Sequence, residues 1–334
     1  MKALEIGDGV GLEALHLIDK PEPVAAPGEV LVRMRAFSLN YRDLLTVLMG
    51  AGRHITPFSD GCGVIEAVGE GVTKFAVGDR VSTLFFQNWT GGPPTVEKLV
   101  TALGGGGRGA GAELVALSQD GVIKVPDFLT DNQVATLACA GLTAWRGLFV
   151  DATLEPGDTV VLQGTGGVSI FGLQFAKAAG LRTVITSSSD EKLERAKAMG
   201  ADHTVNYRTT PEWSKAVREA TGGRGADFVM EVGGAATVAE SLKAIRVGGH
   251  IAIIGVLGGF EQAINFGTML STAARLQGLS VGSRDMFEAM NRALILHRIG
   301  PVVDKVYPWT QAREAFAAMQ AGEHFGKIVL EVGG

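Results

Sequence analysis

Short apolar runs alternate with helical patterns through the second half of the chain. Val160, Val161 and Leu162 belong to a continuous apolar run, which is typical of a strand covered on both faces. A helical pattern over 170–179 follows within a few residues and ends at Gly180. Further predicted elements alternate in the same way: strands at 182–187, 201–207, 226–232 and 250–255, and helices at 190–199, 211–220 and 235–245. This alternation predicts an α/β domain with a parallel, doubly wound sheet.

The turn between the first strand and its helix is rich in glycine, with Gly164, Gly166 and Gly167 around Thr165. Glycines let a backbone approach a pyrophosphate closely, and a helix N-terminus offers free N–H groups and partial positive charge. Ser169 stands where the third glycine of the fingerprint would fall, and a short hydroxyl side chain can still pack near the strand. The turn favours a Rossmann dinucleotide-binding domain over a glycine-rich turn in some other α/β fold.

The first 125 residues or so show a different pattern. Apolar runs at 30–34, 63–68 and 80–84 are separated by Pro-Gly, Gly-Glu-Gly and Gly-Asp turns, which predicts a compact antiparallel barrel or sandwich. Near the other end, we expect helices from Arg284 and over 310–321, a strand starting at 301–303, and a strand at 327–332. We expect this last strand to return to the N-terminal sheet.

Residues 91–111 contain the strings GGPP and GGGGRGAG. So many glycines predict a long mobile loop without a fixed element. The loop is either a lid over the cofactor or a disordered insertion, and the sequence does not separate these two interpretations.

Composition narrows the function classes. The 334 residues are 46% hydrophobic and 19% charged, which predicts two globular domains, and a net charge of −5 without a basic stripe excludes a nucleic-acid-binding role. Two cysteines, Cys62 and Cys139, exclude a disulfide scaffold and suit a reducing cytoplasm. No uncharged apolar segment follows the first lysine, and no run of 18 apolar residues occurs, so neither a signal peptide nor a membrane span is expected.

Several stretches together resemble the medium-chain dehydrogenase/reductase superfamily. The resemblance implies a GroES-like β-barrel made from both chain ends, an inserted Rossmann domain and an active site between them. It implies catalytic-domain segments at 1–127 and 284–334, and a cofactor domain at 128–283. The matching stretches are PGEVLVRMRAFSLNYRDLL, GVIEAVGEGVTKFAVGDRV, TLACAGLTAW, QGTGGVS and HFGKIVL.

The chain departs from the zinc-dependent members of this family. Where those enzymes place zinc ligands, this sequence has Asn40, Ser59 with Asp60, and Cys139. Zinc prefers about four nitrogen or sulfur donors in a tetrahedron, of which catalytic sites usually take three from the protein, and one thiol does not supply them. The four-cysteine structural lobe is also missing. We therefore expect no zinc and a similarity to the quinone oxidoreductase and zinc-free alcohol dehydrogenase branch. Cys139 is either a remnant thiol near the nicotinamide or, the favoured reading, a small buried apolar residue.

The end of the second Rossmann strand predicts the cofactor. An acidic residue at this position would accept hydrogen bonds from the ribose 2′-OH, but the chain has Ser187, followed by Ser188 and Ser189. These hydroxyls and Lys192 suit the 2′-phosphate of NADP(H). The alternative is a helix N-cap cluster with a solvated lysine, and capping can coexist with phosphate binding. By resemblance, Tyr207 lies beside the same phosphate.

Without a metal, the amide of Asn40 is the first candidate to donate a hydrogen bond to a developing enolate or alkoxide. Tyr41 either gives a proton through its phenol or packs in the core. Related quinone oxidoreductases often carry further tyrosines soon after this motif, where this chain has Leu45 and Ala51. Solvent or the cofactor ribose therefore stay open as proton routes.

Other cofactor contacts follow from the resemblance or from position. Thr143 matches a threonine that touches the nicotinamide carboxamide, and Lys327 matches an arginine that reaches the pyrophosphate. Val168, after the glycine turn, and Gly255, at a predicted strand end, complete the predicted cofactor site.

Three functions remain open at this level. The first is zinc-independent, NADPH-dependent reduction of a small molecule with an activated carbonyl or alkene, such as a quinone, enone or aldehyde. The second is oxidation of a primary or secondary alcohol by the same hydride chemistry. The third is a cofactor-binding protein with little turnover. We expect a homodimer paired through the Rossmann strand near 278–282, because the segment QGLSVGS carries no charge that would deter edge pairing. The alternative is an ordinary buried strand of the sheet next to the nicotinamide site.

Overall fold

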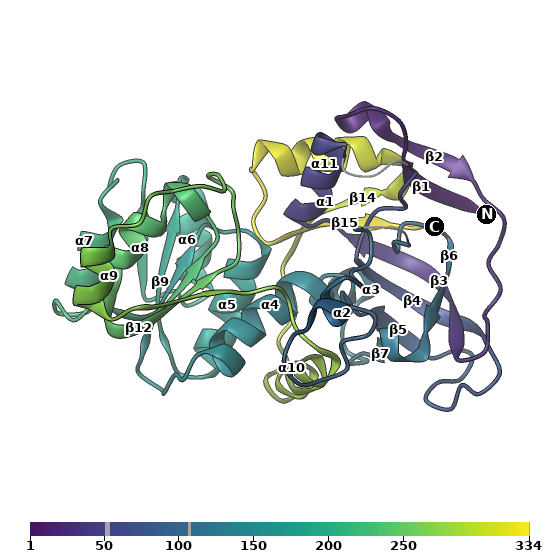
Figure 1. The fold of residues 1–334 in the computed structure, drawn as a ribbon, viewed down its shortest axis with the longest axis horizontal. Coiled ribbons are helices and arrows are strands. Elements are labelled where there is room, and N and C mark those ends of the chain that lie inside the picture. The colour runs from purple at the N-terminus through teal and green to yellow at the C-terminus, as the bar shows by residue number, and fades with distance from the viewer. Residues whose placement is uncertain (51–53, 106–107, 334) are drawn as a thin grey trace. The chain divides into compact units, whose positions relative to one another are not determined.

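A computed structural model describes residues 1–50, 54–105 and 108–333. The chain forms two compact units, one of Met1–Leu142 with Val281–Gly334 and one of Thr143–Ser280 (Figure 1). We call them the catalytic unit and the cofactor unit, after the roles that the resemblance implies for these parts of the chain. The first unit extends past residue 127 because helix α3 (Asp131–Val134) packs on its sheet, where Asp131 pairs with Arg80 at 3.2 Å.

The cofactor unit is built on a six-stranded parallel sheet with the order β10-β9-β8-β11-β12-β13. Its strands are β8 (Thr159–Gln163), β9 (Arg182–Ser187), β10 (His203–Asn206), β11 (Ala226–Glu231), β12 (Ile245–Ile253) and β13 (Arg275–Gly278). The chain runs outward from β8 through β9 to β10, then crosses back to β11 on the other side of β8. This places a topological switch point beside β8, where doubly wound sheets bind ligands. The predicted parallel sheet is confirmed.

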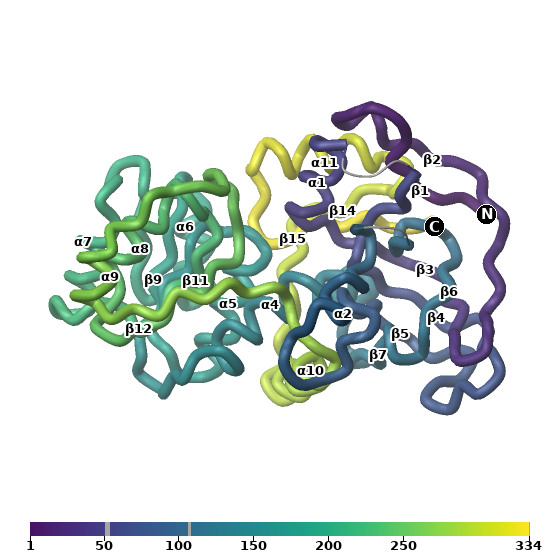
Figure 2. Tube along the Cα trace, viewed as in Figure 1, coloured from purple at the N-terminus to yellow at the C-terminus, as the bar shows by residue number. Residues whose placement is uncertain are grey.

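Helices connect these strands, and they can be followed in Figure 2. They are α5 (Gly167–Ala178), α6 (Asp190–Ala198), α7 (Trp213–Ala220), α8 (Val238–Ala244) and α9 (Phe266–Thr272). All five residues of β8 are buried, which explains why that strand reads as a continuous apolar run. The predicted strand at 250–255 is the second half of β12, which starts at Ile245.

The catalytic unit contains a mostly antiparallel sheet with the order β14-β15-β3-β4-β5-β7, and β6 also pairs with β3. Its strands are β3 (Glu29–Ser38), β4 (Asp60–Val68), β5 (Arg80–Thr83), β6 (Leu114–Ser118), β7 (Val122–Lys124), β14 (Val303–Pro308) and β15 (Lys327–Glu331), with β1 (Lys2–Ile6) and β2 (Leu15–Asp19) as a separate pair. Strand β15 lies antiparallel to β3, with Val329 opposite Ser38. This confirms that the last predicted strand returns to the N-terminal sheet.

Helices of the catalytic unit include α1 (Tyr41–Met49), α10 (Arg284–His297) and α11 (Ala312–Ala321). Aromatic stacking joins the two ends of the chain in the core: the ring centroids of Phe37 and Phe58 are 5.6 Å apart, and those of Phe58 and Phe316 are 5.8 Å apart. No helix among the described residues is long and apolar enough to cross a membrane.

The prediction of a loop without a fixed element over 91–111 was wrong in part. The short helix α2 (Val96–Leu99) lies within it, and residues 106–107 fall outside the described ranges. Lys98 Nζ donates to the carbonyls of Gly91 and Pro93 at 2.8 Å each, and Trp89 Nε1 donates to Gly92 O at 2.9 Å. Side chains outside the GGPP string donate hydrogen bonds to its carbonyls. A prediction from glycine content alone was therefore wrong for this part of the segment.

Candidate active site

Asn40 lies between β3 and α1 and is the N-cap residue of that helix. Its backbone N–H donates to Asp43 Oδ2 at 2.9 Å, as in a capping box. The residue is 7% exposed and the extended backbone (φ −123°, ψ 154°) is normal for an N-cap. Helix capping therefore fixes the backbone from which the predicted catalytic amide projects.

Lys327, the first residue of β15, is buried against Asn40 and only 4% exposed. Its Nζ donates to Leu39 O at 2.5 Å and to Asn40 Oδ1 at 2.6 Å. A lysine this buried is rare unless it is paired. Burial lowers the pKa of Lys327, while the nearby negative charge of Asp60 opposes that shift.

Asp60, the first residue of β4, supplies a buried carboxylate to the same cluster and is fully buried. Its Oδ1 accepts from Ser59 Oγ at 2.6 Å, and its Oδ2 accepts from the backbone N–H of Cys139 at 3.0 Å. Burial raises the pKa of Asp60, and Lys327 partly offsets the rise. Burial and the charge of Asp60 also raise the pKa of the Cys139 thiol, so the thiol is neutral near pH 7.

The amide nitrogen of Asn40 has no hydrogen bond of standard geometry among the described residues. The nearest acceptor for this nitrogen is the Asp60 carboxylate, and a weak hydrogen bond from the Asn40 side chain helps to lower the pKa of Asp60 against the effect of burial. A buried N–H donor without a good acceptor costs about 1–3 kcal/mol. Such a donor is suited to an oxygen that arrives with a ligand.

Tyr41 begins α1 and is 38% exposed. Of the two interpretations of this residue, packing in the core is therefore excluded. Leu45 is half-buried on the same helix, whereas Ala51 lies outside the described residues.

The side chains at the expected metal positions do not fit zinc. Asn40, Ser59, Asp60 and Cys139 offer one amide, one hydroxyl, one carboxylate and one neutral thiol, and the Lys327 ammonium is hydrogen-bonded to the amide oxygen. Within the described ranges, no group of three or more His, Cys, Asp and Glu side chains is arranged to hold a metal ion. A single thiol and a single carboxylate, with the Lys327 ammonium beside them, are unlike the ligand set of a zinc site.

In the cofactor unit, the glycine turn leaves space for a phosphate. Gly164 has φ +71°, and a Cβ added at Gly164 or Gly166 would meet no heavy atom within 4 Å. Helix α5 starts at Gly167, so Gly167 and Val168 form its first turn with free N–H groups. Ser169 Oγ donates to Gln163 O at 2.6 Å, which confirms that a hydroxyl side chain packs against the strand here. These residues fit the pyrophosphate of a dinucleotide.

A buried polar network, which the sequence analysis missed, supports the strand ends beside this turn. Gln163 at the end of β8 donates through Nε2 to Glu231 Oε2 at 2.7 Å. Gln163 Oε1 accepts the N–H groups of Val232 and Gly233 at 3.2 Å each, and Glu231 Oε1 accepts that of Gly234 at 2.9 Å. A polar residue ending each of two apolar strands is the signal that could have identified this network.

Gly255 is explained by close packing rather than by open space. A Cβ at this position would lie 2.3 Å from Val232 O, and the Gly255 N–H donates to Glu231 O at 3.2 Å. Thr143, the other residue expected near the nicotinamide, is 2% exposed in α4 (Leu142–Arg146). Direct cofactor contacts of both residues remain predictions.

The predicted phosphate-binding residues gather at one end of β9 and β10. The backbone N–H of Tyr207 donates to Ser187 O at 3.1 Å, and Ser187 Oγ accepts from the Ser189 N–H at 3.3 Å. Ser189 caps α6 by accepting from the Lys192 N–H at 3.3 Å, so the predicted N-cap cluster exists. Ser188 lies between the two serines. Parallel strands bring Ser187, Tyr207 and the glycine turn to the same edge of the sheet.

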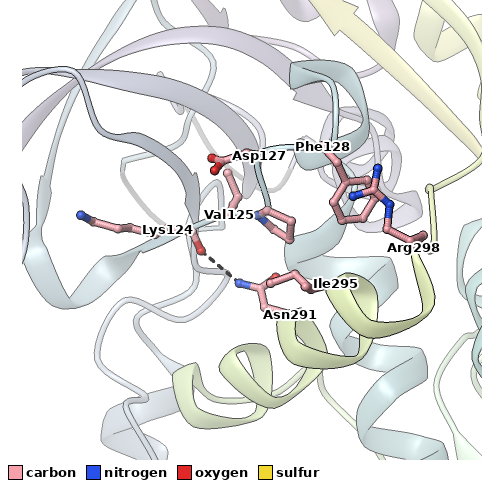
Figure 3. Close-up of a pocket in the computed structure, with 8 residues that line it drawn as sticks. Lys124, Val125, Asp127, Phe128, Asn291, Ile295 and Arg298 are labelled. Carbon is pink, nitrogen blue, oxygen red and sulfur yellow. Dashed lines mark hydrogen bonds between the residues drawn. The ribbon is translucent and has the colours of Figure 1, made fainter.

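A separate open cavity of about 640 Å³ lies in the catalytic unit (Figure 3). Asn291 Nδ2 donates to Lys124 O at 3.0 Å in its wall, and the guanidinium of Arg298 lies 4.4 Å from the ring centroid of Phe128. None of the predicted site residues lines it.

Family models match most of the chain. The alcohol dehydrogenase GroES-like domain matches residues 26–127, and the zinc-binding dehydrogenase domain matches residues 167–295. Among curated proteins, a zinc-type alcohol dehydrogenase-like protein of Schizosaccharomyces pombe is 42% identical over 92% of this chain and 91% of its own length. A 2-haloacrylate reductase of a Burkholderia species is 30% identical over 91% of each chain.

Solved structures agree with these matches. The crystal structure of a putative alcohol dehydrogenase from Sinorhizobium meliloti 1021 has 41% identity and a TM-score of 0.91, covering 99% of each chain. An NAD-dependent alcohol dehydrogenase has 34% identity and a TM-score of 0.91 over the full length of both chains. A mycobacterial protein complexed with NADPH has 28% identity and a TM-score of 0.84, covering 99% of this chain and all of its own. Similar proteins therefore include both an NAD-dependent enzyme and an NADPH complex.

Gly166→Ala should weaken cofactor binding with little loss of stability. The added methyl group meets no protein atom within 4 Å, but it occupies space that we assign to the pyrophosphate. We expect a melting temperature within a few degrees of wild type, because alanine is a somewhat poorer N-cap than glycine. The NADPH dissociation constant should rise about tenfold or more, or ~1.4 kcal/mol. Fluorescence titration and thermal melts measure the two quantities. Gly7→Ala in the catalytic unit is the control, since its methyl group would make only ordinary contacts of 3.4 Å or longer. Unchanged NADPH affinity in Gly166→Ala would contradict the assignment.

Asp43→Asn should change how stability depends on pH. Burial raises the pKa of Asp43 from 3.8 to about 6, so folding favours its protonated form. This contribution is fully present below the unfolded-state pKa and is lost as pH rises through about 6. We expect the wild-type free energy of unfolding to fall relative to that of the variant across this window. Urea denaturation at several pH values measures the difference, with the exposed Glu22→Gln as control. Parallel curves for wild type and Asp43→Asn would count against the shift.

Proposed function

We infer the function from one premise: the chain belongs to the medium-chain dehydrogenase/reductase superfamily and is an oxidoreductase. We propose that it is a zinc-independent, NADPH-dependent enzyme that reduces an activated carbonyl or alkene of a small molecule. Quinones, enones and aldehydes are the substrate classes of this chemistry. The relative named 2-haloacrylate reductase supports the proposal, because its name describes an alkene conjugated to a carboxylate.

The observation that carries the proposal is the buried amide of Asn40. Its nitrogen lacks a hydrogen bond of standard geometry. The positions where zinc-dependent relatives have metal ligands carry polar side chains here, and the Lys327 ammonium is hydrogen-bonded to the Asn40 amide oxygen. Hydride addition to a carbonyl or enone leaves negative charge on oxygen, and a preorganised N–H donor stabilises that charge. Asn40 Nδ2 is the proposed donor. It replaces the Lewis acid that a metal would provide.

The cofactor unit fits NADPH. When bound, NADPH supplies the hydride. The N–H groups at the start of α5 and the open glycine turn would bind its pyrophosphate, and Ser187, Ser188, Lys192 and Tyr207 would hold the 2′-phosphate. Tyr41 is the proposed proton donor among side chains, because it directly follows Asn40 and is 38% exposed.

A second candidate is the reverse reaction, oxidation of a primary or secondary alcohol with NADP. The relatives and structures named alcohol dehydrogenases favour it. The same residues would serve, with Asn40 binding the alcohol oxygen as it becomes a carbonyl. We propose a cytoplasmic location for either reaction, because Cys62 and Cys139 are both free thiols.

Steady-state assays with and without metal chelators test the function. A panel of quinones, enones, aldehydes and secondary alcohols should reveal NADPH-dependent reduction that persists after chelation, and elemental analysis should find no stoichiometric zinc. Turnover of alcohols alone would favour the second candidate. One zinc per chain, or activity lost on chelation, would overturn the zinc-independent mechanism.

We expect the protein to bind NADPH more tightly than NADH. The variants Ser187→Asp and Lys192→Ala should reduce this difference in affinity between the two cofactors. A charged hydrogen bond to phosphate contributes about 1.5 to 3 kcal/mol, or roughly 10- to 100-fold in affinity. Titration of each variant with both cofactors measures the ratio. Lys197→Ala, on an exposed position of the same helix, is the control. Equal affinity of the wild type for both cofactors would refute the preference.

We also propose a homodimer formed along the sheet edge of the cofactor unit. The edge strand is β13 (Arg275–Gly278), so the pairing segment lies earlier than 278–282 and includes the charge of Arg275. On the neighbouring helix α9, Phe266 and Leu270 are 75% and 83% exposed and lie one turn apart on one face. An open edge beside exposed apolar side chains is a surface that a second copy can cover.

Leu270→Asp should therefore weaken the dimer. Light scattering should give about twice the chain mass of 34.9 kDa for the wild type and a lower average mass for the variant at the same concentration. Val10→Asp, at a position 68% exposed in the catalytic unit, should leave the mass unchanged. A wild-type monomer at micromolar concentration would exclude the proposal.

A further inference from the structure

The hydrogen-bond partner of Asn40 Oδ1 determines which way the amide points. An asparagine side chain can present oxygen or nitrogen to a neighbour, because rotation by half a turn exchanges the two. An ammonium can only donate. Since Lys327 Nζ lies 2.6 Å from the Asn40 side chain, the atom facing it must be the oxygen. The nitrogen is then directed away from Lys327.

We propose that Lys327 is a positioning residue that locks the Asn40 amide with Nδ2 available to the substrate oxygen. This inference rests on the proposed function of Asn40. It differs from the expectation that Lys327 binds the cofactor pyrophosphate, because both donor bonds that fix Nζ go to Leu39 and Asn40 within the catalytic unit.

Other features of the cluster also indicate that Lys327 fixes the orientation of the Asn40 amide. Lys327 is 4% exposed, so water competes little for its ammonium. The Leu39 carbonyl holds Nζ from one side, while the Asn40 backbone is fixed by Asp43. Asp60, fully buried, provides the negative charge that keeps a buried ammonium protonated. Both the ammonium that binds the amide oxygen and the backbone that carries the amide are therefore held in place.

The lock also accounts for the lack of a standard hydrogen bond at Nδ2. If the amide could rotate freely, it would turn its nitrogen toward whichever acceptor gives the better bond. With the oxygen fixed on Lys327, the nitrogen keeps a buried and poorly satisfied position. That cost is recovered when an oxygen carrying negative charge binds there.

Lys327→Met tests the inference, because methionine keeps the apolar stem and removes the donors. We expect kcat to fall about 10- to 100-fold, which is less than the loss of about 10²–10³ on removal of an oxyanion donor, because the Asn40 amide is misoriented rather than deleted. The NADPH dissociation constant should stay within about threefold of wild type. Lys327→Arg should restore most of the activity, since a guanidinium also only donates. Lys305→Met, an exposed lysine on the adjacent strand β14, is the matched control.

Two further readouts separate a lock from a merely structural role. The side-chain ¹⁵N amide signal of Asn40, assigned by its loss in Asn40→Asp, should shift in Lys327→Met and stay in place in Lys305→Met. The kcat of wild type should also fall at alkaline pH as Lys327 loses its proton, and Lys327→Arg should lack this limb. Asp60 from β4, Asp43 from α1 and Cys139 face the ammonium, and burial sets its pKa below 10.5.

The outcomes are distinct. Weaker NADPH binding with unchanged kcat in Lys327→Met would identify a pyrophosphate ligand and overturn the lock, as would wild-type values of both. If Asn40→Asp retained full kcat, the proposed role of Asn40 would fail whatever Lys327 does.

The double variant Asn40→Asp/Lys327→Met should lose no more kcat than Asn40→Asp alone, because both changes remove the same function. If Lys327→Met does not fold, Lys327→Gln, which leaves the amide either orientation, takes its place with the same expected loss of kcat.

Discussion

The pairing of β15 with β3 is the constraint on which the catalytic unit depends. These strands come from opposite ends of the described chain, and their register sets Val329 against Ser38. Two residues further along each strand, the same pairing brings the side chain of Lys327 to the start of α1. Strand β4 lies on the other side of β3 and adds Asp60 to the cluster. The buried polar cluster of Lys327, Asn40 and Asp60 thus combines side chains from three separate segments of the chain.

The buried cluster has an electrostatic logic. The ammonium of Lys327 and the carboxylates of Asp43 and Asp60 are all buried, and the attraction between opposite charges reduces the free-energy cost of burying each of them. Burial raises the pKa of Asp43 and Asp60 and lowers that of Lys327, so every group is shifted toward its neutral form while the mutual attraction opposes the shift. A metal would meet this arrangement as an additional positive charge beside the ammonium. The Lys327 ammonium already places one positive charge beside the Asn40 side chain.

The architecture could be predicted from the sequence because apolar strand patterns and glycine-rich turns are both local signals. Apolar strands such as Val160 to Leu162 and turns such as Gly164 to Gly167 reveal their periodicity and backbone needs within a few residues. The contact between Lys327 and Asn40 carries no such signal, since 287 positions separate the two side chains and only the sheet register joins them. Local patterns also misjudged 91–111, where the hydrogen bonds from Lys98 and Trp89 stabilise glycine-rich backbone. The Gln163–Glu231 network escaped notice because polar residues at strand ends usually face solvent.

The division of the chain also sets an order for folding during synthesis. The cofactor unit uses one continuous segment, Thr143–Ser280, so its strands can pair once that segment has left the ribosome. The sheet of the catalytic unit lacks β15 until Lys327 to Glu331 have been made. Until then, β3 presents an open edge where Phe37 and Ser38 will later be covered. The cofactor unit can therefore fold while the contact between Asn40 and Lys327 is still unformed, and completion of the chain is what covers this edge of β3.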